Sequence, residues 1–124
     1  MLLFRNWDYY LLNTLEKTNA AFVGPITNKS AGLQCENYYL KDVTEENYNS
    51  KAIEITQKSS GAVKKGRFKL VGFCLMAKAE LTRQLNGFDE NFYLGNFEDN
   101  DFCLRGLLLK GCNAISEDCF VYHF

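Results

Sequence analysis

The segment at residues 87–105, which reads GFDENFYLGNFEDNDFCLR, restricts the possible folds of this chain more than any other stretch. It carries five carboxylates (positions 89, 90, 98, 99 and 101) and five aromatic rings (positions 88, 92, 93, 97 and 102). A solvated acidic run would hold fewer rings, and an ordinary core segment would hold fewer carboxylates. The mixture predicts acids held at fixed positions on an apolar scaffold, as in the wall of a cleft.

An amphipathic helix is predicted at residues 98–110. Its apolar residues recur at spacings of three and four, which is the pattern of one buried helix face, and Gly111 is placed to end it. The carboxylates of Glu98, Asp99 and Asp101 then fall in the first turn, where free backbone N–H groups and the helix dipole favour them. Stabilising the first turn of a helix is a purely structural role. A carboxylate fixed there could equally act as a general base or bind a cation, and the local pattern leaves both roles open.

Length and composition predict a single domain over residues 1–124. The chain is 47% hydrophobic, which is enough for a real core, and its net charge of -1 argues against an electrostatic nucleic-acid binder. The basic cluster at residues 64–69 suits a solvated loop or strand edge better than a phosphate contact. Five cysteines without a CxxC pair give little support for a zinc site, and they favour a reducing cytosol. We expect neither a signal peptide nor a membrane span at the N-terminus.

Helices and strands are predicted to alternate, which places the chain in the α/β class. The predicted helices cover residues 7–18, 45–57, 79–85 and 98–110. The predicted strands cover residues 20–24, 67–78, 113–115 and 119–122, with the tail of another at residues 1–4. Pro25 should stop the first of these strands, and the connections should be loops or turns at residues 26–42, 58–66 and 116–118.

The apolar run at residues 67–78 is the longest in the chain and predicts a central strand buried on both faces. Gly72 interrupts it, and a glycine inside a strand often marks a bulge or a close approach by another backbone or a ligand. His123, the only histidine, follows the last predicted strand. It reaches the acidic segment if that strand lies beside the central one, and it is otherwise a surface residue.

Residues 70–123 carry a familiar series of motifs: Gly72 in an apolar run, the turn Gly87-Phe88-Asp89-Glu90, the helix start Glu98-Asp99-Asn100-Asp101 with Arg105, then Gly111 and a strand ending at His123. In this order they resemble the second half of the family 2 inverting glycosyltransferases, which have the GT-A fold. Residues 6–28 resemble, more weakly, the helix and strand that follow the family's nucleotide-sugar metal motif. The resemblance implies a partial GT-A-like mixed sheet flanked by helices.

Two departures from the family pattern bear on function. The amino-terminal, nucleotide-binding half of the family, with its D-x-D motif after an apolar strand, is absent. Asp99-Asn100-Asp101 matches D-x-D literally but stands at a helix start, so it is not assigned as the diphosphate-metal motif. The chain also stops at Phe124, just past the histidine. We therefore expect a fragment that does not transfer sugar by itself.

In the intact enzyme, the resemblance implies transfer of a sugar from a nucleotide-sugar donor to an acceptor hydroxyl with inversion. A hydroxyl is a poor nucleophile until a base takes its proton. By its position in the family's motif, Asp99 is then this general base. Glu98 and Asp101 flank it at the substrate, and Gly72 lets the backbone approach donor or acceptor. His123 joins the shell of a Mg²⁺ or Mn²⁺ ion that stabilises the leaving diphosphate. We expect Arg105 to pair with Asp101 rather than to touch substrate.

The acceptor class stays open among carbohydrate, lipid and protein. The expected location is cytoplasmic, including the inner face of the membrane, in the synthesis of cell-envelope polysaccharide. The alternative is a non-catalytic remnant that binds a partner or forms homo-oligomers through exposed strand edges. Calcium binding by the acidic segment fails on spacing, because the fifth and sixth loop positions counted from Asp89 are Tyr93 and Leu94.

Overall fold

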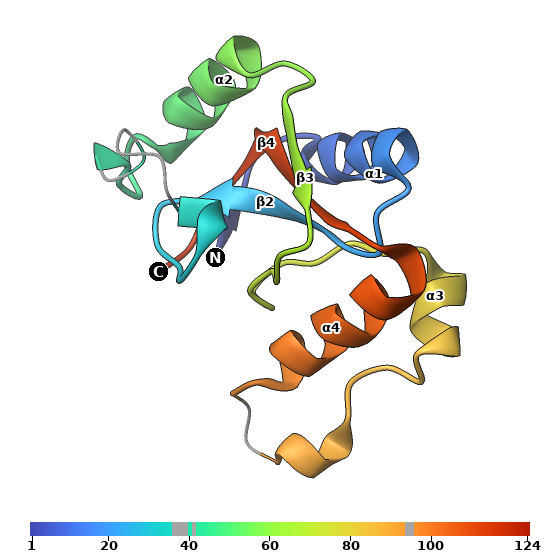
Figure 1. Ribbon diagram of the computed structural model, residues 1–124. Coiled ribbons are helices and arrows are strands. Elements are labelled where there is room, and N and C mark those ends of the chain that lie inside the picture. Colours follow the sequence, from blue (N-terminus) through green and yellow to red (C-terminus); the bar gives the residue numbers. More distant parts are fainter. Residues whose placement is uncertain (36–39, 41, 94–95) are drawn as a thin grey trace.

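The computed structural model describes residues 1–35, 40, 42–93 and 96–124, and it is a mixed α/β fold built on a four-stranded sheet (Figure 1). The central strand is β4 (Asn113–Tyr122), which pairs parallel with β2 and antiparallel with both β1 and β3. The other strands are β1 (Leu2–Leu3), β2 (Val23–Thr27) and β3 (Val63–Gly66). The α-helices are α1 (Trp7–Thr18), α2 (Tyr48–Lys58), α3 (Ala79–Gln84) and α4 (Glu98–Lys110).

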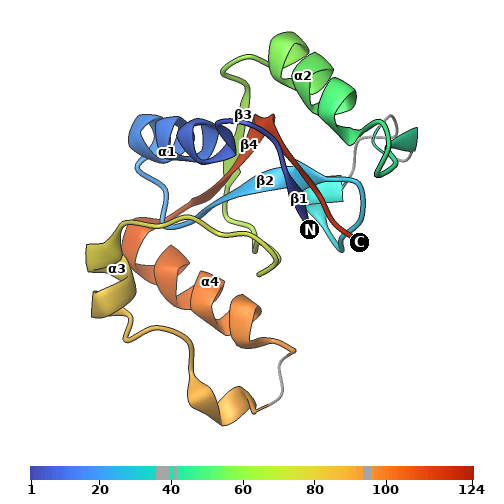
Figure 2. The same ribbon diagram turned by 180° about the vertical axis from the view of Figure 1, so that it is seen from behind.

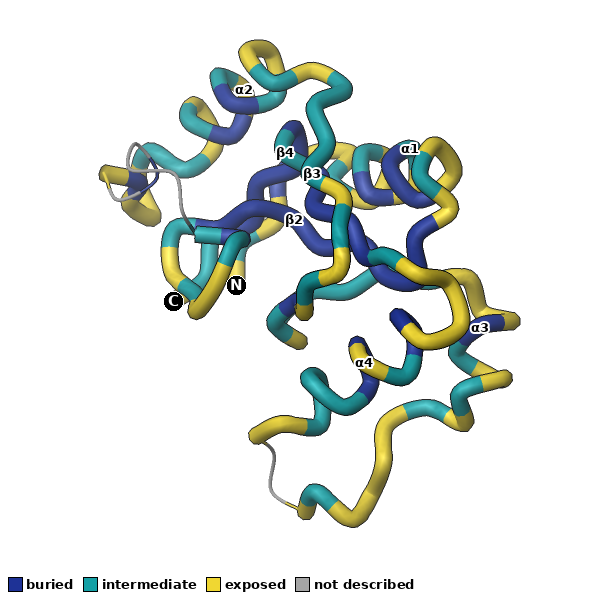
Figure 3. The backbone as a smooth tube through the Cα atoms, viewed as in Figure 1, coloured by how far each residue is buried: buried dark blue, intermediate teal, exposed yellow. Residues whose placement is uncertain are grey.

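Helices cover the sheet from two sides. Figures 1 and 2 show α1 and α2 above the strands, and α3 and α4 below them. The close packing of α4 depends on Gly106, where a Cβ atom would lie 2.3 Å from the Phe22 ring. The rings of Phe22 and Phe102 pack at 4.6 Å between centroids. In Figure 3 the deepest burial follows β2 and β4, so the core sits on the two parallel strands.

The prediction of two short strands around a polar turn at residues 116–118 was wrong, because β4 is one strand of 10 residues. Ser116 and Asp118 are buried, but their polar groups find partners inside the fold. Ser116 Oγ lies 2.7 Å from Asp118 Oδ1 and 2.9 Å from Thr14 Oγ1, and the Gly61 N–H donates to Asp118 Oδ2. Polar residues that are satisfied in this way remain within a buried strand.

The apolar run at residues 67–78 is not the predicted central strand. Its one β-bridge joins Met76 to Val23, and the rest is an irregular connection. Its backbone groups are bonded mainly by side chains. Gln34 Oε1 accepts a hydrogen bond from the Val71 N–H, and Asn113 Nδ2 donates to the Phe68 carbonyl. An apolar segment can therefore be buried without a strand ladder when side chains satisfy its backbone.

Two smaller predictions also fail. Pro25 does not stop the strand but lies within β2, where the register with β4 shifts between Pro25 and Ile26. A proline is tolerated at such an irregularity because no ladder hydrogen bond from its nitrogen is needed. Residues 63–66, expected in a loop, form β3 at the side of β4. The pattern there, Val-Lys-Lys-Gly, is too short and polar to indicate a strand.

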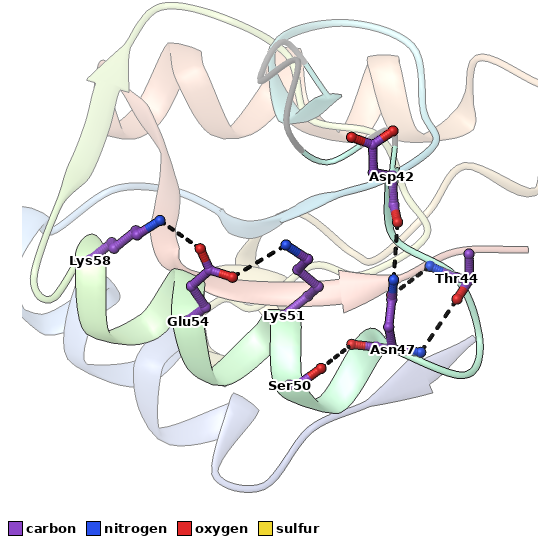
Figure 4. A network of polar contacts seen from close by, with 7 residues as sticks. All are labelled: Asp42, Thr44, Asn47, Ser50, Lys51, Glu54 and Lys58. Carbon is purple, nitrogen blue, oxygen red and sulfur yellow. Dashed lines mark hydrogen bonds and ion pairs between the residues drawn. The ribbon is translucent and has the colours of Figure 1, made fainter.

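α2 begins at Tyr48, three residues later than predicted (Figure 4). Thr44 still marks its entrance, because Thr44 and Asn47 exchange hydrogen bonds: the Thr44 N–H donates to Asn47 Oδ1 at 2.7 Å, and the Asn47 N–H donates to Thr44 Oγ1 at 3.3 Å. This reciprocal pattern is that of a capping box. Farther along, Glu54 pairs with Lys51 and Lys58, and these ammonium groups lower the pKa of its carboxyl.

The helices predicted around α1, α3 and α4 are confirmed, with the bounds of α1 and α4 as expected. Across the described part of the chain, no helix has the length and apolarity that a membrane crossing requires.

Candidate functional site

The carboxylate of Asp99 is fixed against the backbone of Gly72. Asp99 is the second residue of α4, and its Oδ2 accepts a hydrogen bond from the Gly72 N–H at 2.8 Å. Its Oδ1 accepts one from the Asn100 N–H, also at 2.8 Å. A Cβ atom at Gly72 would lie 2.9 Å from Asp99 Cβ, so only glycine allows this approach. The close approach expected at Gly72 is present, and the group that approaches is Asp99.

A cavity of about 280 Å³ opens beside this contact. Glu98 and Asp99 line it together with Lys69 and residues of the loop after β2, including Gly32. Asn96 and Phe97 also line it, with φ angles of 72° and 74°. Left-handed backbone at residues other than glycine is costly and is concentrated at functional sites.

Within this cavity Glu98 has an oxygen without a partner. Glu98 Oε2 is inaccessible to solvent and receives no hydrogen bond from the residues described. A buried acceptor left unpaired costs about 1–3 kcal/mol, and native proteins rarely leave one without reason. Glu98, predicted as substrate-binding, lines the cavity, but this oxygen is closed to solvent, so its contact with substrate stays a prediction.

His123 is held at the end of β4 by the loop that follows β2. Its backbone N–H donates to Asn28 Oδ1 at 2.8 Å, and its ring Nδ1 lies 2.8 Å from the Lys29 carbonyl oxygen. A carbonyl oxygen can only accept, so Nδ1 carries a proton, and in the neutral ring Nε2 presents a lone pair. The ring stacks on Phe73 with centroids 5.2 Å apart and planes 25° apart.

Asp99 and His123, the two predicted functional residues, contact consecutive residues of the same segment. Gly72 contacts Asp99, and the next residue, Phe73, contacts His123. Consecutive Cα atoms are about 3.8 Å apart, so the base candidate and the imidazole flank one short segment of backbone. The two residues thus contact neighbouring positions of one segment, although His123 is not among the residues that line the Asp99 cavity.

Asp101 lies apart from the Asp99 cavity. Its Oδ2 is 2.8 Å from Arg105 Nε, and the expected pairing of these two residues is confirmed. Arg105 also donates to the carbonyl oxygens of Leu85 and Gly87, which fastens the turn before η3 (Glu90–Phe92) to α4. Asp101 lines a second, more open cavity of about 580 Å³ with Asp89 and Glu90. Its predicted contact with substrate stays a prediction.

The residues described do not build a metal site by themselves. No three histidine, cysteine, aspartate or glutamate side chains among them gather closely enough to hold an ion. His123 can offer one nitrogen ligand, and its Nδ1–H bond to a backbone carbonyl is the usual support for a ligating imidazole. One ligand is not a site, so no chemical step below is derived through Mg²⁺ or Mn²⁺.

The cysteines near the site are unreactive thiols. Burial raises the pKa of Cys74 to about 11 and also raises that of Cys103, whose Sγ lies 3.5 Å from the Leu70 carbonyl oxygen. A thiol with a raised pKa is a poor nucleophile at neutral pH. These groups therefore contribute packing and not chemistry.

Sequence reasoning missed Gln34, Asn28 and Phe73. Gln34 is almost fully buried and bridges β2 to residue 71, since its Nε2 donates to the Pro25 carbonyl oxygen at 2.9 Å. All three owe their roles to contacts between distant parts of the chain. The one available signal was the length of the predicted loop at residues 26–42, because long loops in compact domains are often functional.

No protein-family model matches the chain, and no curated protein and no solved structure is significantly similar to it.

Proposed function

We propose that these residues form the acceptor-side half of an inverting glycosyltransferase with a partial GT-A-like fold, in which Asp99 is the general base. The observation that carries the proposal is the contact of Asp99 with Gly72 at the wall of a cavity, one residue before the Phe73–His123 stack. No described residue is assigned to the donor nucleotide. The proposed setting is the cytoplasm, including the inner face of the membrane.

Asp99 is suited to take a proton from an acceptor hydroxyl. Each of its carboxylate oxygens accepts one backbone hydrogen bond, which fixes the group and leaves a further lone pair on each oxygen. The acceptor O–H gives its proton to Asp99 as the oxygen forms a bond to the anomeric carbon. The bond from that carbon to the diphosphate oxygen breaks on the opposite face, and the diphosphate leaves with the electron pair.

Glu98 would orient the acceptor. Glu98 lines the same cavity as Asp99, so its carboxylate would accept a hydrogen bond from a second hydroxyl of the acceptor, while Asp99 receives the proton that is transferred. Holding the nucleophile in this way reduces the entropic part of the barrier. An acceptor with at least two hydroxyl groups fits this arrangement better than one with a single hydroxyl.

The leaving diphosphate needs positive charge near it. A Mg²⁺ or Mn²⁺ ion, when bound, would neutralise the negative charge that develops on the diphosphate, and His123 Nε2 is the one ligand that the described residues would contribute.

The test is a transfer assay on the full-length protein that contains these residues. Incubation with a panel of nucleotide sugars and hydroxyl acceptors should give a product whose anomeric configuration, read by NMR, is opposite to that of the donor. A product with retained configuration, or activity that survives Asp99→Asn unchanged, would contradict the proposal.

A further inference from the structure

Exposed apolar side chains form a stripe along the outer side of α4. Phe97, Leu104 and Leu108 are 67%, 56% and 72% exposed, respectively. They are seven and four residues apart, so they lie on one side of the helix. The opposite side is buried, where Phe102 and Gly106 pack on Phe22. A contiguous exposed apolar patch on a small domain commonly marks an interaction site.

The two ends of this stripe carry opposite charge. Near the first turns of α4, Asp89 and Glu90 line a cavity with Asp101 and Arg105. Because Asp101 and Arg105 pair with each other, Asp89 and Glu90 carry the net negative charge of this cavity. At the other end, Lys110 is the last residue of the helix, and Arg67 Nη1 donates a weak hydrogen bond of 3.5 Å to the Gly111 carbonyl oxygen. The partial charges of the helix dipole have the opposite sign to these side chains, because the positive end of the dipole lies at the acidic residues and the negative end at the basic ones.

We propose that the outer face of α4 is a homodimer interface, in which two copies pack α4 against α4 in antiparallel orientation about a two-fold axis near Leu104. Such an axis places the acidic end of each helix beside the basic end of its partner, and the helix dipole, about half a charge at each end, only partly offsets these side-chain charges. The exposed leucines of each copy then lose their contact with water against those of the other. A parallel arrangement would instead bring like charges together, so charge complementarity selects the antiparallel one.

This interface differs from the strand-edge association expected from the sequence. β3 carries Lys64 and Lys65, and charged lysines on an edge strand oppose edge-to-edge pairing. The side of β2 away from β4 is occupied, since Met76 pairs with Val23, and Gln34 donates to the Pro25 carbonyl oxygen. α4 therefore offers the better surface.

The dimer does not depend on the proposed sugar transfer. Asp99 is five residues before Leu104, which places the two about 140° apart around the helix. The carboxylate faces Gly72, whereas the leucine faces solvent. Association on the outer face leaves the Asp99 cavity accessible, so either proposal can fail without the other.

Sedimentation equilibrium of the chain tests the interface. The wild type should show a concentration-dependent mass that approaches twice the 14.2 kDa of one chain. Leu104→Glu and Leu108→Glu should each raise the dissociation constant by about tenfold or more. Leu12→Glu is the matched control, because Leu12 is an exposed leucine of α1 and should leave association unchanged. A wild type that stays monomeric up to its solubility limit would overturn the proposal, as would equal effects at all three positions.

Charge reversal tests the antiparallel orientation without changing any apolar residue. Lys110→Glu should weaken the dimer, because it places acid against acid. Adding Glu90→Lys to Lys110→Glu should restore association toward the wild-type value. A double variant that is weaker than the single variant would contradict the antiparallel arrangement.

Discussion

The backbone N–H of Gly72 donates a hydrogen bond to Asp99 Oδ2 across 2.8 Å, although the two residues are 27 positions apart in sequence. The contact connects the irregular segment at residues 67–78 to the first turn of α4. It fixes the orientation of the carboxylate before any ligand arrives, and it depends on the absence of a side chain at residue 72.

Gly72→Ala should lower the free energy of unfolding by about 1–3 kcal/mol, because the new methyl group would lie 2.9 Å from Asp99 Cβ and would force α4 or residue 72 to move. Urea denaturation measures the change. Gly66→Ala is the control, since its methyl group would meet only the Phe68 ring, at 3.2 Å. An equal or larger loss in the control would show that the Asp99 contact is not the cause.

Arg105→Lys should destabilise the fold by about 2 kcal/mol, because one ammonium cannot reproduce the bonds of the guanidinium to Asp101 and to the carbonyl oxygens of Leu85 and Gly87. Thermal or urea unfolding would detect this loss. Arg83→Lys offers a comparison, since Arg83 is exposed and, among the residues described, donates to the Ala79 carbonyl oxygen alone, at 3.3 Å. Similar losses of stability at both positions would show that the additional hydrogen bonds of Arg105 are not the cause.

Asp118→Ala should lower the free energy of unfolding by about 1–3 kcal/mol, because the buried Ser116 hydroxyl would lose one of its partners and the Gly61 N–H would lose its acceptor. Glu117→Gln, on the neighbouring and less buried residue, should be nearly neutral. Denaturant titration of both variants makes the comparison. No loss at Asp118 would mean that the polar groups in β4 are replaceable by water.

Cys74 should resist alkylation until strongly alkaline pH, because burial raises the pKa of its thiol from 9.0 to about 11. Between these values the folded thiol keeps a proton that the unfolded thiol loses. Its contribution to stability is therefore fully present below pH 9 and is lost as the pH rises through about 11. Mass spectrometry after iodoacetamide treatment measures the rate, with the chain unfolded in urea as the control. Equal rates for folded and unfolded chains at pH 9 would contradict this assignment.

The helices could be predicted from the sequence because their signals are local. The first-turn acids, the apolar spacing and Gly111 together define α4, and Thr44 marks the approach to α2. The sheet was predicted less well than the helices, because the contacts that determine it are not local in sequence. The run at residues 67–78 looks like a strand, but its backbone is bonded by Gln34 and by Asp99, from distant parts of the chain.

The prediction of a polar turn within β4 failed for the same reason. Ser116 and Asp118 resemble a turn in sequence, and their partners Thr14 and Gly61 are known only once the chain has folded. At the candidate site, the residue types and their order indicated Gly72, Asp99 and His123. The sequence could not indicate Phe73, which connects them, because a single apolar residue carries no signal of what it stacks on.

The most direct test of the account is the turnover number for sugar transfer with Asp99→Asn against that with Asp8→Asn, in the transferase to which we propose these residues belong. Asp8 is the second residue of α1, as Asp99 is of α4, so both changes remove a carboxylate from the same place in a helix. Asp99→Asn should lower kcat for sugar transfer by about a hundredfold to ten-thousandfold, whereas Asp8→Asn should leave it unchanged. Equal turnover by the two variants would contradict the assignment of Asp99 as the base.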